Sequence, residues 1–434
     1  MKQTIKKGSE NYAAQVISLP HMNAVEGLDN LVQVTYQGNP CLVQKHSDKD
    51  ALYLFFPAGS VLDPKFLSDN NLYRHTENNL DKTKAGFFEN TGRVKAIKFK
   101  GVISTGFIIP INSLSYLIDP SALKQGDSFT DINDQPICWK FIRRTSGFNS
   151  GAGHSRFDLD SLVRPQFIPE HPDTAQLLKN SHHLHQNDMI TITHKLHGTS
   201  IRIFHVPTKR RLSLLERLFK KVGVRLQEEE FSYMVGSRRV IKSCNFNLLD
   251  KPTVESDDLW TRVTYHTLKG KLHPGEAVYA EVVGSDYANG AIQQGYTYGL
   301  TSPKLFIYRI AQINQEGMEV DLGWPQVKQR AKELGVDTVP ELFSGRLGDF
   351  LSKYSVPKDN QHDQTDIAAA LEWVFYDQLL EQPSVLDEQV VEEGFVLRKE
   401  SYPKASALKI KSRKFLLHET KMQDTEMVDL EEEN

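Results

Sequence analysis

The sequence predicts an α+β protein whose N-terminal part consists mainly of β-strands. Short strand-like runs separated by Gly and Pro dominate residues 1–144, which is typical of a small antiparallel barrel or sandwich. The rest of the chain mixes strands with a few helix-like segments, such as Leu214–Val222 and Val327–Leu334, in no regular alternation. This order favours α+β over a doubly wound α/β fold. With 434 residues, of which 39% are hydrophobic and 25% charged, we expect two or three globular domains.

Two hairpins account for much of the β-rich N-terminal part. The run Leu31–Tyr36 alternates apolar and polar residues, and a turn containing Gly, Asn and Pro leads back through Cys41–Val43. In the second hairpin, Val94–Phe99 is followed by a turn at Lys100-Gly101 and by the apolar run Gly106–Ile109. We expect these two runs to pair with each other.

Composition also marks the boundaries between domains. Six of the eleven residues from Thr145 to Ser155 are Gly or Ser, which predicts a linker. The last twenty residues carry seven acids and one lysine, which predicts an acidic tail with a disordered end. We therefore expect an N-terminal domain at residues 1–144, a linker at 145–156, a second domain at 157–418 and an acidic tail at 419–434.

Charge and cysteine content exclude several classes of protein. Lys and Arg number 52 and Asp and Glu 55, so a net charge of −3 excludes a globally basic nucleic-acid coat but not a local basic site. Cys41, Cys138 and Cys244 are isolated, which excludes a disulfide framework and a thiolate zinc site of standard spacing. The apolar runs are too short to cross a bilayer. We expect a soluble intracellular protein, cytoplasmic and without a membrane partner.

Lys195 lies in the segment that is most informative about chemistry. The strand-like runs Met189–Ile192 and Ile201–Phe204 flank the sequence Lys-Leu-His-Gly, so Lys195 lies at a turn between strands. Gly198 allows the backbone to approach a ligand closely. Taken alone, the pattern favours an exposed turn lysine over a functional one.

Three later strand-like segments carry charge where an ordinary core strand would carry none. Glu281 interrupts an apolar run, and Glu393 comes directly before a glycine and a strand. Lys409 and Lys411 alternate with apolar residues, so the period of two places both lysines on one face of a strand. Together with Lys195, these residues form a candidate site.

In this order, the set resembles the covalent nucleotidyltransferases, which include ATP-dependent DNA and RNA ligases and mRNA capping enzymes. Six motifs carry the resemblance: Lys195-Leu196-His197-Gly198, Ser237-Arg238-Arg239, the strand of Glu281, the aromatic strand Leu305–Ile310, Glu393–Arg398 and Leu408–Lys411. Ala291–Gly299 resembles RNA ligases in particular. Gly92–Pro110 resembles the N-terminal OB-type module of the Deinococcus/Naegleria class of RNA ligases. The resemblance therefore implies a nucleotidyltransferase domain preceded by a small OB-like barrel.

The sequence departs from the family pattern in two places. The usual nucleophile motif has Asp two residues after the lysine, whereas this chain has His197, as some phage-type RNA ligases do. The chain also ends soon after Lys411. We therefore expect the N-terminal domain to grip the substrate, and this disfavours a DNA ligase or a capping enzyme.

The resemblance implies a reaction in three steps: a lysine is adenylated by ATP, AMP passes to a 5′-phosphate end, and a 3′-OH displaces AMP. The implied catalytic residues are Lys195, Lys409, Lys411 and Arg238. Positive charge from Lys409 and Lys411 would favour the free amine of Lys195. The implied nucleotide contacts are Lys195, Leu196, His197, Gly198, Arg238, Glu281, Tyr308, Phe306, Glu393, Lys409 and Lys411. We expect the rings of Phe306 and Tyr308 to point the same way along one strand. Tyr308, which the resemblance favours, or else Phe306 would face adenine, and Glu281 and Glu393 would face Mg²⁺ or Mn²⁺, or the ribose.

The expected substrate is RNA or a nicked duplex that contains RNA, bound by a monomer. Arg93, Lys95, Lys98 and Lys100 lie on or beside one strand-like run and are the candidate nucleic-acid contacts of the N-terminal domain. The alternatives are a catalytically silent RNA-binding module on the same fold, a DNA ligase and a capping nucleotidyltransferase.

Overall fold

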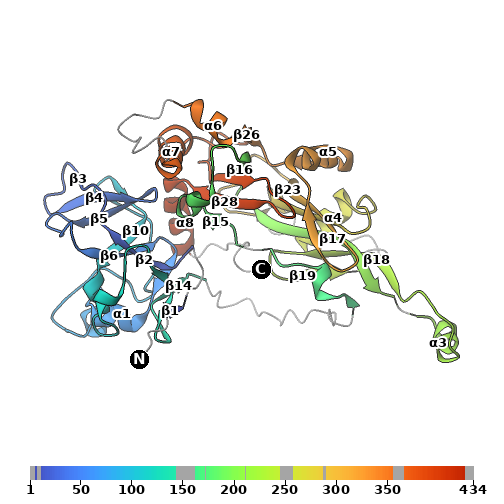
Figure 1. The fold of residues 1–434 in the computed structure, drawn as a ribbon, viewed down its shortest axis with the longest axis horizontal. Coiled ribbons are helices and arrows are strands. Elements are labelled where there is room, and N and C mark those ends of the chain that lie inside the picture. Colours follow the sequence, from blue (N-terminus) through green and yellow to red (C-terminus); the bar gives the residue numbers. More distant parts are fainter. Residues whose placement is uncertain are drawn as a thin grey trace.

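The computed structural model shows a β-rich N-terminal part beside a larger body built on two sheets (Figure 1). None of its described helices is long and apolar enough to cross a membrane. The expected linker at 145–156 lies outside the described residues. The structure describes residues 5–6, 11–142, 162–171, 173–210, 212–244, 258–286, 290–354 and 366–425.

The N-terminal part consists of several small antiparallel sheets. Its elements are β1 (Ile5–Lys6), β2 (Ala14–Ser18), β3 (Asn23–Ala24), β4 (Leu31–Tyr36), β5 (Asn39–Gln44), β6 (Leu52–Pro57), β7 (Ser60–Leu62), α1 (Pro64–Asp69), β8 (Ile97–Phe99), β9 (Val102–Ser104), β10 (Gly106–Pro110), β11 (Ser128–Phe129), β12 (Asp131–Ile132), β13 (Gln135–Pro136) and β14 (Cys138–Lys140). The central sheet has the order β10-β6-β2-β11, and β3-β4-β5 form a second sheet. The described strands of this part do not close into a barrel.

The first predicted hairpin is confirmed and the second is wrong. β4 and β5 pair around a turn at Gln37-Gly38. β8, however, pairs with β9, and the apolar run of β10 pairs with β6 instead. Ile97 and Phe99 of β8 are exposed, whereas Ile108 of β10 is buried. The apolar run therefore joins the sheet that removes most of its surface from water.

The second part is an α+β body, as predicted. Its elements are β15 (Ala175–Gln176), β16 (Met189–Lys195), β17 (Thr199–Lys209), α3 (Leu214–Lys221), β18 (Glu229–Gly236), β19 (Ile241–Cys244), α4 (Leu259–Thr267), β20 (Glu276–Val283), β21 (Ser285–Asp286), β22 (Gly290–Ala291), β23 (Lys304–Ile313), β24 (Glu319–Asp321), α5 (Trp324–Leu334), β25 (Asp337–Thr338), β26 (Glu341–Arg346), α6 (Leu347–Ser352), α7 (Ile367–Trp373), β27 (Gly394–Lys399), β28 (Ser406–Lys411) and α8 (Arg413–Asp424). Both predicted helices form, as α3 and as the greater part of α5.

Two sheets position the candidate site. One has the order β15-β28-β27-β16-β26, and the other has the order β19-β18-β17-β20-β23-β24, with β25 added to β23. The chain passes from the first sheet to the second between β16 and β17. Lys195 is the last residue of β16, and Thr199 is the first residue of β17. Leu196, within the connection, is buried in the main apolar core. The candidate nucleophile is thereby fixed at the junction of two sheets.

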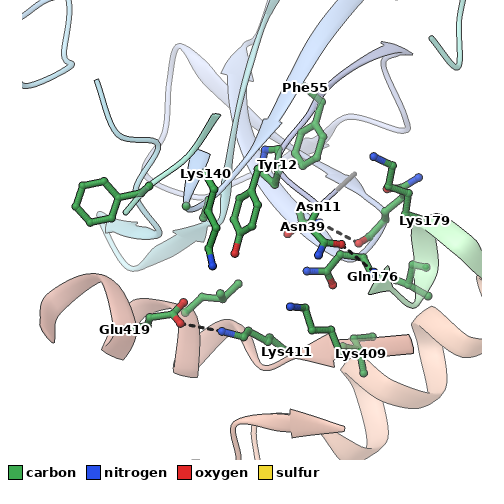
Figure 2. Close-up of a pocket in the computed structure, with 18 of the residues that line it drawn as sticks. Asn11, Tyr12, Asn39, Phe55, Lys140, Gln176, Lys179, Lys409, Lys411 and Glu419 are labelled. Atoms are coloured by element: carbon green, nitrogen blue, oxygen red, sulfur yellow. Dashed lines mark hydrogen bonds and ion pairs between the residues drawn. The ribbon is translucent and has the colours of Figure 1, made fainter. Parts of the chain in front are cut away.

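Helix α8, at the C-terminal end of the second part, packs against the N-terminal part. Ser412 caps its first turn, and Phe415 is fully buried. The helix continues to Asp424, so the expected boundary between domain and tail at 418/419 falls inside it. Glu419 lies 2.8 Å from the ammonium group of Lys411. A dashed line marks this ion pair in Figure 2. Glu419, which was assigned to the acidic tail, therefore has a cationic partner that counting acids along the sequence does not reveal.

Candidate functional site

The buried carboxylate of Glu393 is the centre of the candidate site. Because β16 and β27 are neighbours, Glu393 Oε1 lies 2.7 Å from Lys195 Nζ. The same oxygen lies 3.6 Å from Lys411 Nζ on the next strand, β28. A second contact lies alongside, with His194 Nδ1 2.9 Å from Glu392 Oε2. The amine of Lys195 therefore contacts a carboxylate directly, and Lys411 is reached only across that carboxylate.

Glu281 holds the connection that follows Lys195. Its Oε1 accepts the backbone N–H of Gly198 at 3.1 Å, and its Oε2 accepts the hydroxyl of Ser200 at 3.2 Å. β20 passes so close that a Cβ atom at position 198 would lie 2.3 Å from the carbonyl oxygen of Val282. Gly198 does not have a positive φ angle, so its backbone conformation does not require glycine. Glycine is required here because there is no space for a side chain.

Two further side chains, which the sequence did not single out, fix the same connection. The backbone N–H of His197 donates to the hydroxyl of Tyr298 at 2.8 Å, and Gln293 Nε2 donates to the carbonyl of Gly198 at 2.9 Å. Burial raises the pKa of Tyr298, so its hydroxyl stays neutral. Both residues belong to Ala291–Gly299, the segment that resembles RNA ligases. The resemblance drew attention to this segment but did not reveal its role.

His197 lies against aromatic rings rather than in the cavity. Its ring meets those of Tyr296 and Phe415 edge to face, with centroids 5.0 and 4.9 Å away. His197 Nδ1 and Glu393 Oε2 are both buried without a hydrogen-bond partner, and they lie 3.8 Å apart. The described residues contain no group of three or more His, Cys, Asp or Glu arranged to hold a metal ion. These two buried atoms could nevertheless act together as ligands of a metal ion.

A cavity of about 490 Å³ lies next to Lys195, within the size range of small-molecule sites. Six residues expected from the sequence line it: Lys195, Leu196, Arg238, Glu281, Tyr308 and Lys409. Five others expected from the sequence do not line it: His197, Gly198, Phe306, Glu393 and Lys411. Its size and mixed lining suit a nucleotide better than a lone ion.

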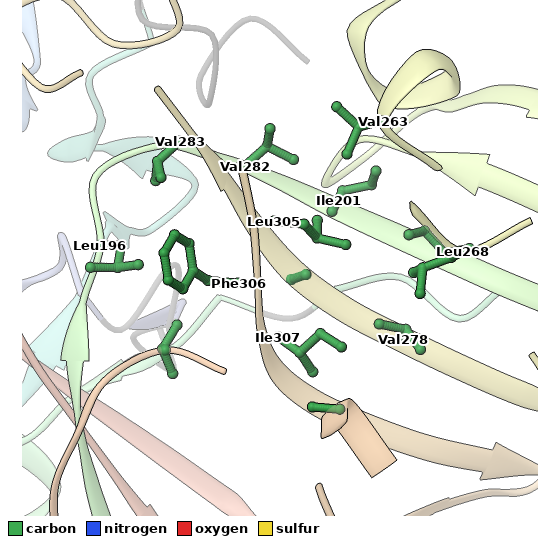
Figure 3. Packing of buried hydrophobic residues seen from close by; sticks show 14 of the residues in the cluster. Leu196, Ile201, Val263, Leu268, Val278, Val282, Val283, Leu305, Phe306 and Ile307 are labelled. Carbon is green, nitrogen blue, oxygen red and sulfur yellow. The ribbon is translucent and has the colours of Figure 1, made fainter. Parts of the chain in front are cut away.

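The two candidate aromatic residues differ in position. Tyr308 lines the cavity and its hydroxyl lies 2.8 Å from His171 Nε2. Phe306 is buried in the apolar core beside Leu196, as Figure 3 shows. The expectation that both rings point the same way is wrong, because a register shift leaves Tyr308 without a partner on β20 and interrupts the alternation of the strand. Of the two, Tyr308 is the one positioned to contact a base.

Arg238 lies at one side of the cavity. Its guanidinium forms an ion pair with Asp173, and both residues line the cavity. Burial raises the pKa of Asp173, but Arg238, Lys140 and Lys409 outweigh this effect and hold it below its usual value. Lys140 comes from the N-terminal part, so cations of both parts converge here.

The lining of the cavity also includes a charge network that the sequence did not predict. Arg309 lies 2.9 Å from Glu319 Oε2 and 2.7 Å from Asp321 Oδ1, and Lys404 lies 2.6 Å from Glu319. All four residues line the cavity. Because these two cations are paired with two acids, the network offers no excess positive charge to a phosphate.

Two of the four nucleic-acid contacts expected in the N-terminal part have a different role. Arg93 is buried, and Arg93 and Lys95 lie 3.4 and 3.0 Å from the carboxylate of Asp424 in α8. Lys98 and Lys100 are exposed. Arg93 and Lys95 therefore hold the two parts of the molecule together, whereas Lys98 and Lys100 remain accessible to a ligand.

Residues 188–413, more than half of the chain, match the RNA ligase family. No curated protein gives a significant match to the sequence. The fold is similar to those of three solved structures of the RNA ligase of Naegleria gruberi. A mutant with AMP and Mn has a TM-score of 0.56 at 15% identity over 93% of this chain and 97% of that chain. A mutant with ATP and Mn has a TM-score of 0.55 at 14% identity, over 95% of this chain and 99% of that chain. The protein with PPi has a TM-score of 0.56 at 15% identity, over 94% of this chain and 98% of that chain.

Replacing Gly198 by Ala tests the close packing of the connection after Lys195. The new Cβ would meet the backbone of Val282, so we expect the free energy of unfolding to fall by about 1–3 kcal/mol. Gly323→Ala is the matched control, because the nearest atom there is the flexible end of the Gln326 side chain. Chemical denaturation measures both changes. An equal loss in the two variants would contradict the account of the packing.

Proposed function

Because the chain belongs to the RNA ligase family, we propose that it joins RNA ends with ATP through an adenylate carried on Lys195. One observation carries the proposal: the amine of Lys195 meets a buried carboxylate at the edge of a nucleotide-sized cavity. Glu281 and Tyr308 line the same cavity. An exposed turn lysine would have none of these neighbours.

In the first step, Lys195 Nζ attacks the α-phosphorus of ATP. A nitrogen–phosphorus bond forms, the bond from that phosphorus to the bridging oxygen breaks, and pyrophosphate leaves. A lysine amine with an ordinary pKa of about 10.4 is protonated at neutral pH, so attack requires loss of a proton. Glu393 Oε1, 2.7 Å away, is positioned to accept it.

The lining of the cavity supplies a place for each part of ATP. Tyr308 offers an aromatic ring and Leu196 an apolar surface to adenine. Glu281, whose carboxylate is held by the backbone after Lys195, faces the ribose. Lys409 and Arg238 also line the cavity, and their positive charges would stabilise the phosphates.

A divalent metal fits beside Glu393. Glu393 Oε2 and His197 Nδ1 are buried and unpaired, and a hard, mostly hydrated Mg²⁺ or Mn²⁺ needs few protein ligands when it also binds phosphate and water. Such a metal would neutralise charge on the phosphates of ATP. The expected pairing of Glu281 with Glu393 as two metal ligands fits less well, since both oxygens of Glu281 accept hydrogen bonds.

In the second step, an oxygen of an RNA 5′-phosphate attacks the adenylate phosphorus and the bond to Lys195 breaks. In the third step, a 3′-OH attacks the 5′-phosphate and AMP leaves. We propose that the N-terminal sheets act as an OB-like unit that grips RNA or an RNA-containing nicked duplex through surfaces such as Lys98 and Lys100. Cytoplasmic location and a monomeric state are part of the same proposal.

Incubation with α-labelled ATP and Mg²⁺ or Mn²⁺, followed by a denaturing gel, tests the first step. We expect label on the wild-type protein and none on Lys195→Ala, because within the described part of the chain no other amine both contacts Glu393 and lines the cavity. Lys332→Ala removes an exposed lysine of α5 and should keep the label. A wild-type protein that takes no label would favour a silent RNA-binding module.

Sealing of nicked duplexes tests the choice between RNA and DNA. Two substrates are compared that differ only in the last sugar of the 3′-OH strand, ribose or deoxyribose. We expect faster sealing of the ribose end, as an RNA ligase requires, measured as initial rates on a gel. Equal rates on both substrates would contradict RNA specificity and favour a DNA ligase.

A further inference from the structure

Helix α3 carries apolar side chains that the described part of the chain leaves exposed. Figure 1 shows the helix at the tip of a long arm formed by β17 and β18, away from the rest of the second part. None of its residues is buried. Six large apolar side chains of the helix and the turn after it are between 47% and 79% exposed: Leu214, Leu215, Leu218, Phe219, Val222 and Val224. Single exposed apolar residues are common on protein surfaces, but a continuous group marks a contact surface.

The spacing of these residues gathers them on one side of the helix. Successive residues of an α-helix are rotated by about 100° around its axis. One continuous arc, the apolar face of α3, holds five residues: Leu214, Leu215, Leu218, Phe219 and Val222. The opposite arc holds only charged residues: Glu216, Arg217, Lys220 and Lys221. A short helix with an apolar face and a basic opposite face is typical of helices that lie in the surface of a membrane or in the groove of a partner.

Local interactions define both ends of α3. Ser213 Oγ accepts the backbone N–H of Glu216 at 3.3 Å, and Glu216 Oε2 accepts the backbone N–H of Ser213 at 2.7 Å. Gly223, with a φ of 89°, ends the helix. Even when capped, a helix of eight residues that buries no apolar surface is marginal in water. A partner that covers the apolar face would supply the missing stabilisation.

The charges around the helix are positive in excess. Residues 213–225 contain four cations and one acid. The acid, Glu216, is already paired with Arg210 at 2.7 Å, and one cation, Lys220, is paired with Glu228 at 2.7 Å. The other three cations are exposed and form no ion pair with any residue that the structure describes: Arg217, Lys221 and Arg225. These cations lie beside the apolar face and are available to an anionic partner.

The combination of apolar face and free cations distinguishes between partners. RNA would use the cations but leave the apolar face exposed, because phosphates are contacted by charged and polar groups. A second copy of the chain would cover the apolar face, but α3 is only about 12 Å long. Such a contact is much smaller than a stable dimer interface, and it would bring like charges together.

A bilayer that contains anionic lipid satisfies both features at once. Its acyl chains take up apolar side chains, and its headgroups attract the neighbouring cations. The position of the helix also suits a flat surface, because a protruding tip reaches such a surface before the rest of the molecule does (Figure 1).

We propose that α3 binds the surface of a membrane that contains anionic lipid, with its apolar face among the acyl chains next to the headgroups. Arg217, Lys221 and Arg225 contact the headgroups. The arm of β17 and β18 then holds the rest of the chain at the membrane surface. This differs from the expectation of a protein without a membrane partner. That expectation rested on the length of apolar runs, which bears only on helices that span a bilayer.

Sedimentation of the full-length protein with lipid vesicles tests the proposal. One set of vesicles contains phosphatidylcholine alone, and the other contains phosphatidylcholine and phosphatidylserine in a two-to-one ratio. We expect the wild-type protein to bind the anionic vesicles about tenfold or more tightly than the neutral ones. Leu218→Ser/Phe219→Ser removes part of the apolar face, and Arg217→Gln/Lys221→Gln removes two cations. Each double variant should bind the anionic vesicles about tenfold or more weakly than wild type.

Matched controls remove exposed residues of the same kinds elsewhere on the molecule. Leu80→Ser/Met318→Ser removes two exposed apolar side chains, and Lys45→Gln/Lys332→Gln removes two exposed lysines. Both control variants should bind the anionic vesicles as wild type does. The unfolding midpoint of every variant shows whether it is folded.

Three results would overturn the proposal. The first is a wild-type protein that does not bind the anionic vesicles, or that binds neutral vesicles equally well. The second is a loss of vesicle binding that the controls show to the same extent. The third is that Arg217→Gln/Lys221→Gln weakens binding of an RNA duplex, or that Leu218→Ser/Phe219→Ser dissociates a dimer, while vesicle binding is unchanged. The apolar face would then belong to an RNA contact or to a second copy of the chain.

Discussion

The carboxylate of Glu393 is the constraint on which the rest of the site depends. It is buried and meets two ammonium groups, those of Lys195 and Lys411, through one oxygen. A buried carboxylate without such partners would be strongly unfavourable, so the two lysines are held where they are by its charge. Its other oxygen remains unpaired beside His197. One side chain thus links the nucleophile, Lys411 and the place where a metal fits.

The fold makes this convergence possible by passing the chain from one sheet to the other directly after Lys195. The strands of the first sheet bring Lys195, Glu393 and the two lysines of β28 together, and the second sheet supplies Glu281 and Tyr308. Hydrogen bonds hold the connection rigidly, so the amine cannot swing away from the cavity with its backbone. Pre-organisation of this kind is how a protein lowers the cost of reaching a reactive geometry.

Much of this site could be predicted from the sequence, because its motifs resemble those of a known family and lie on strands whose alternation helps to show which side chains share a face. Lys195, Glu281 and Lys409 line the nucleotide-sized cavity as expected. Phe306 was misplaced because a register shift in β23 cannot be seen in an alternating pattern. Arg93 was misassigned because its partner, Asp424, is far away in sequence. Local patterns give no information on such distant pairings.

Central to this account is that the charge of Glu393 prepares Lys195 for attack, and Glu393→Gln tests this most directly because the side chain keeps its shape. The measurement is the rate of label transfer from α-labelled ATP to the protein, with the unfolding midpoint as a check of folding. The account predicts a rate about a hundredfold or more below wild type, as for loss of a general base. A folded Glu393→Gln protein that is labelled at the wild-type rate would contradict it.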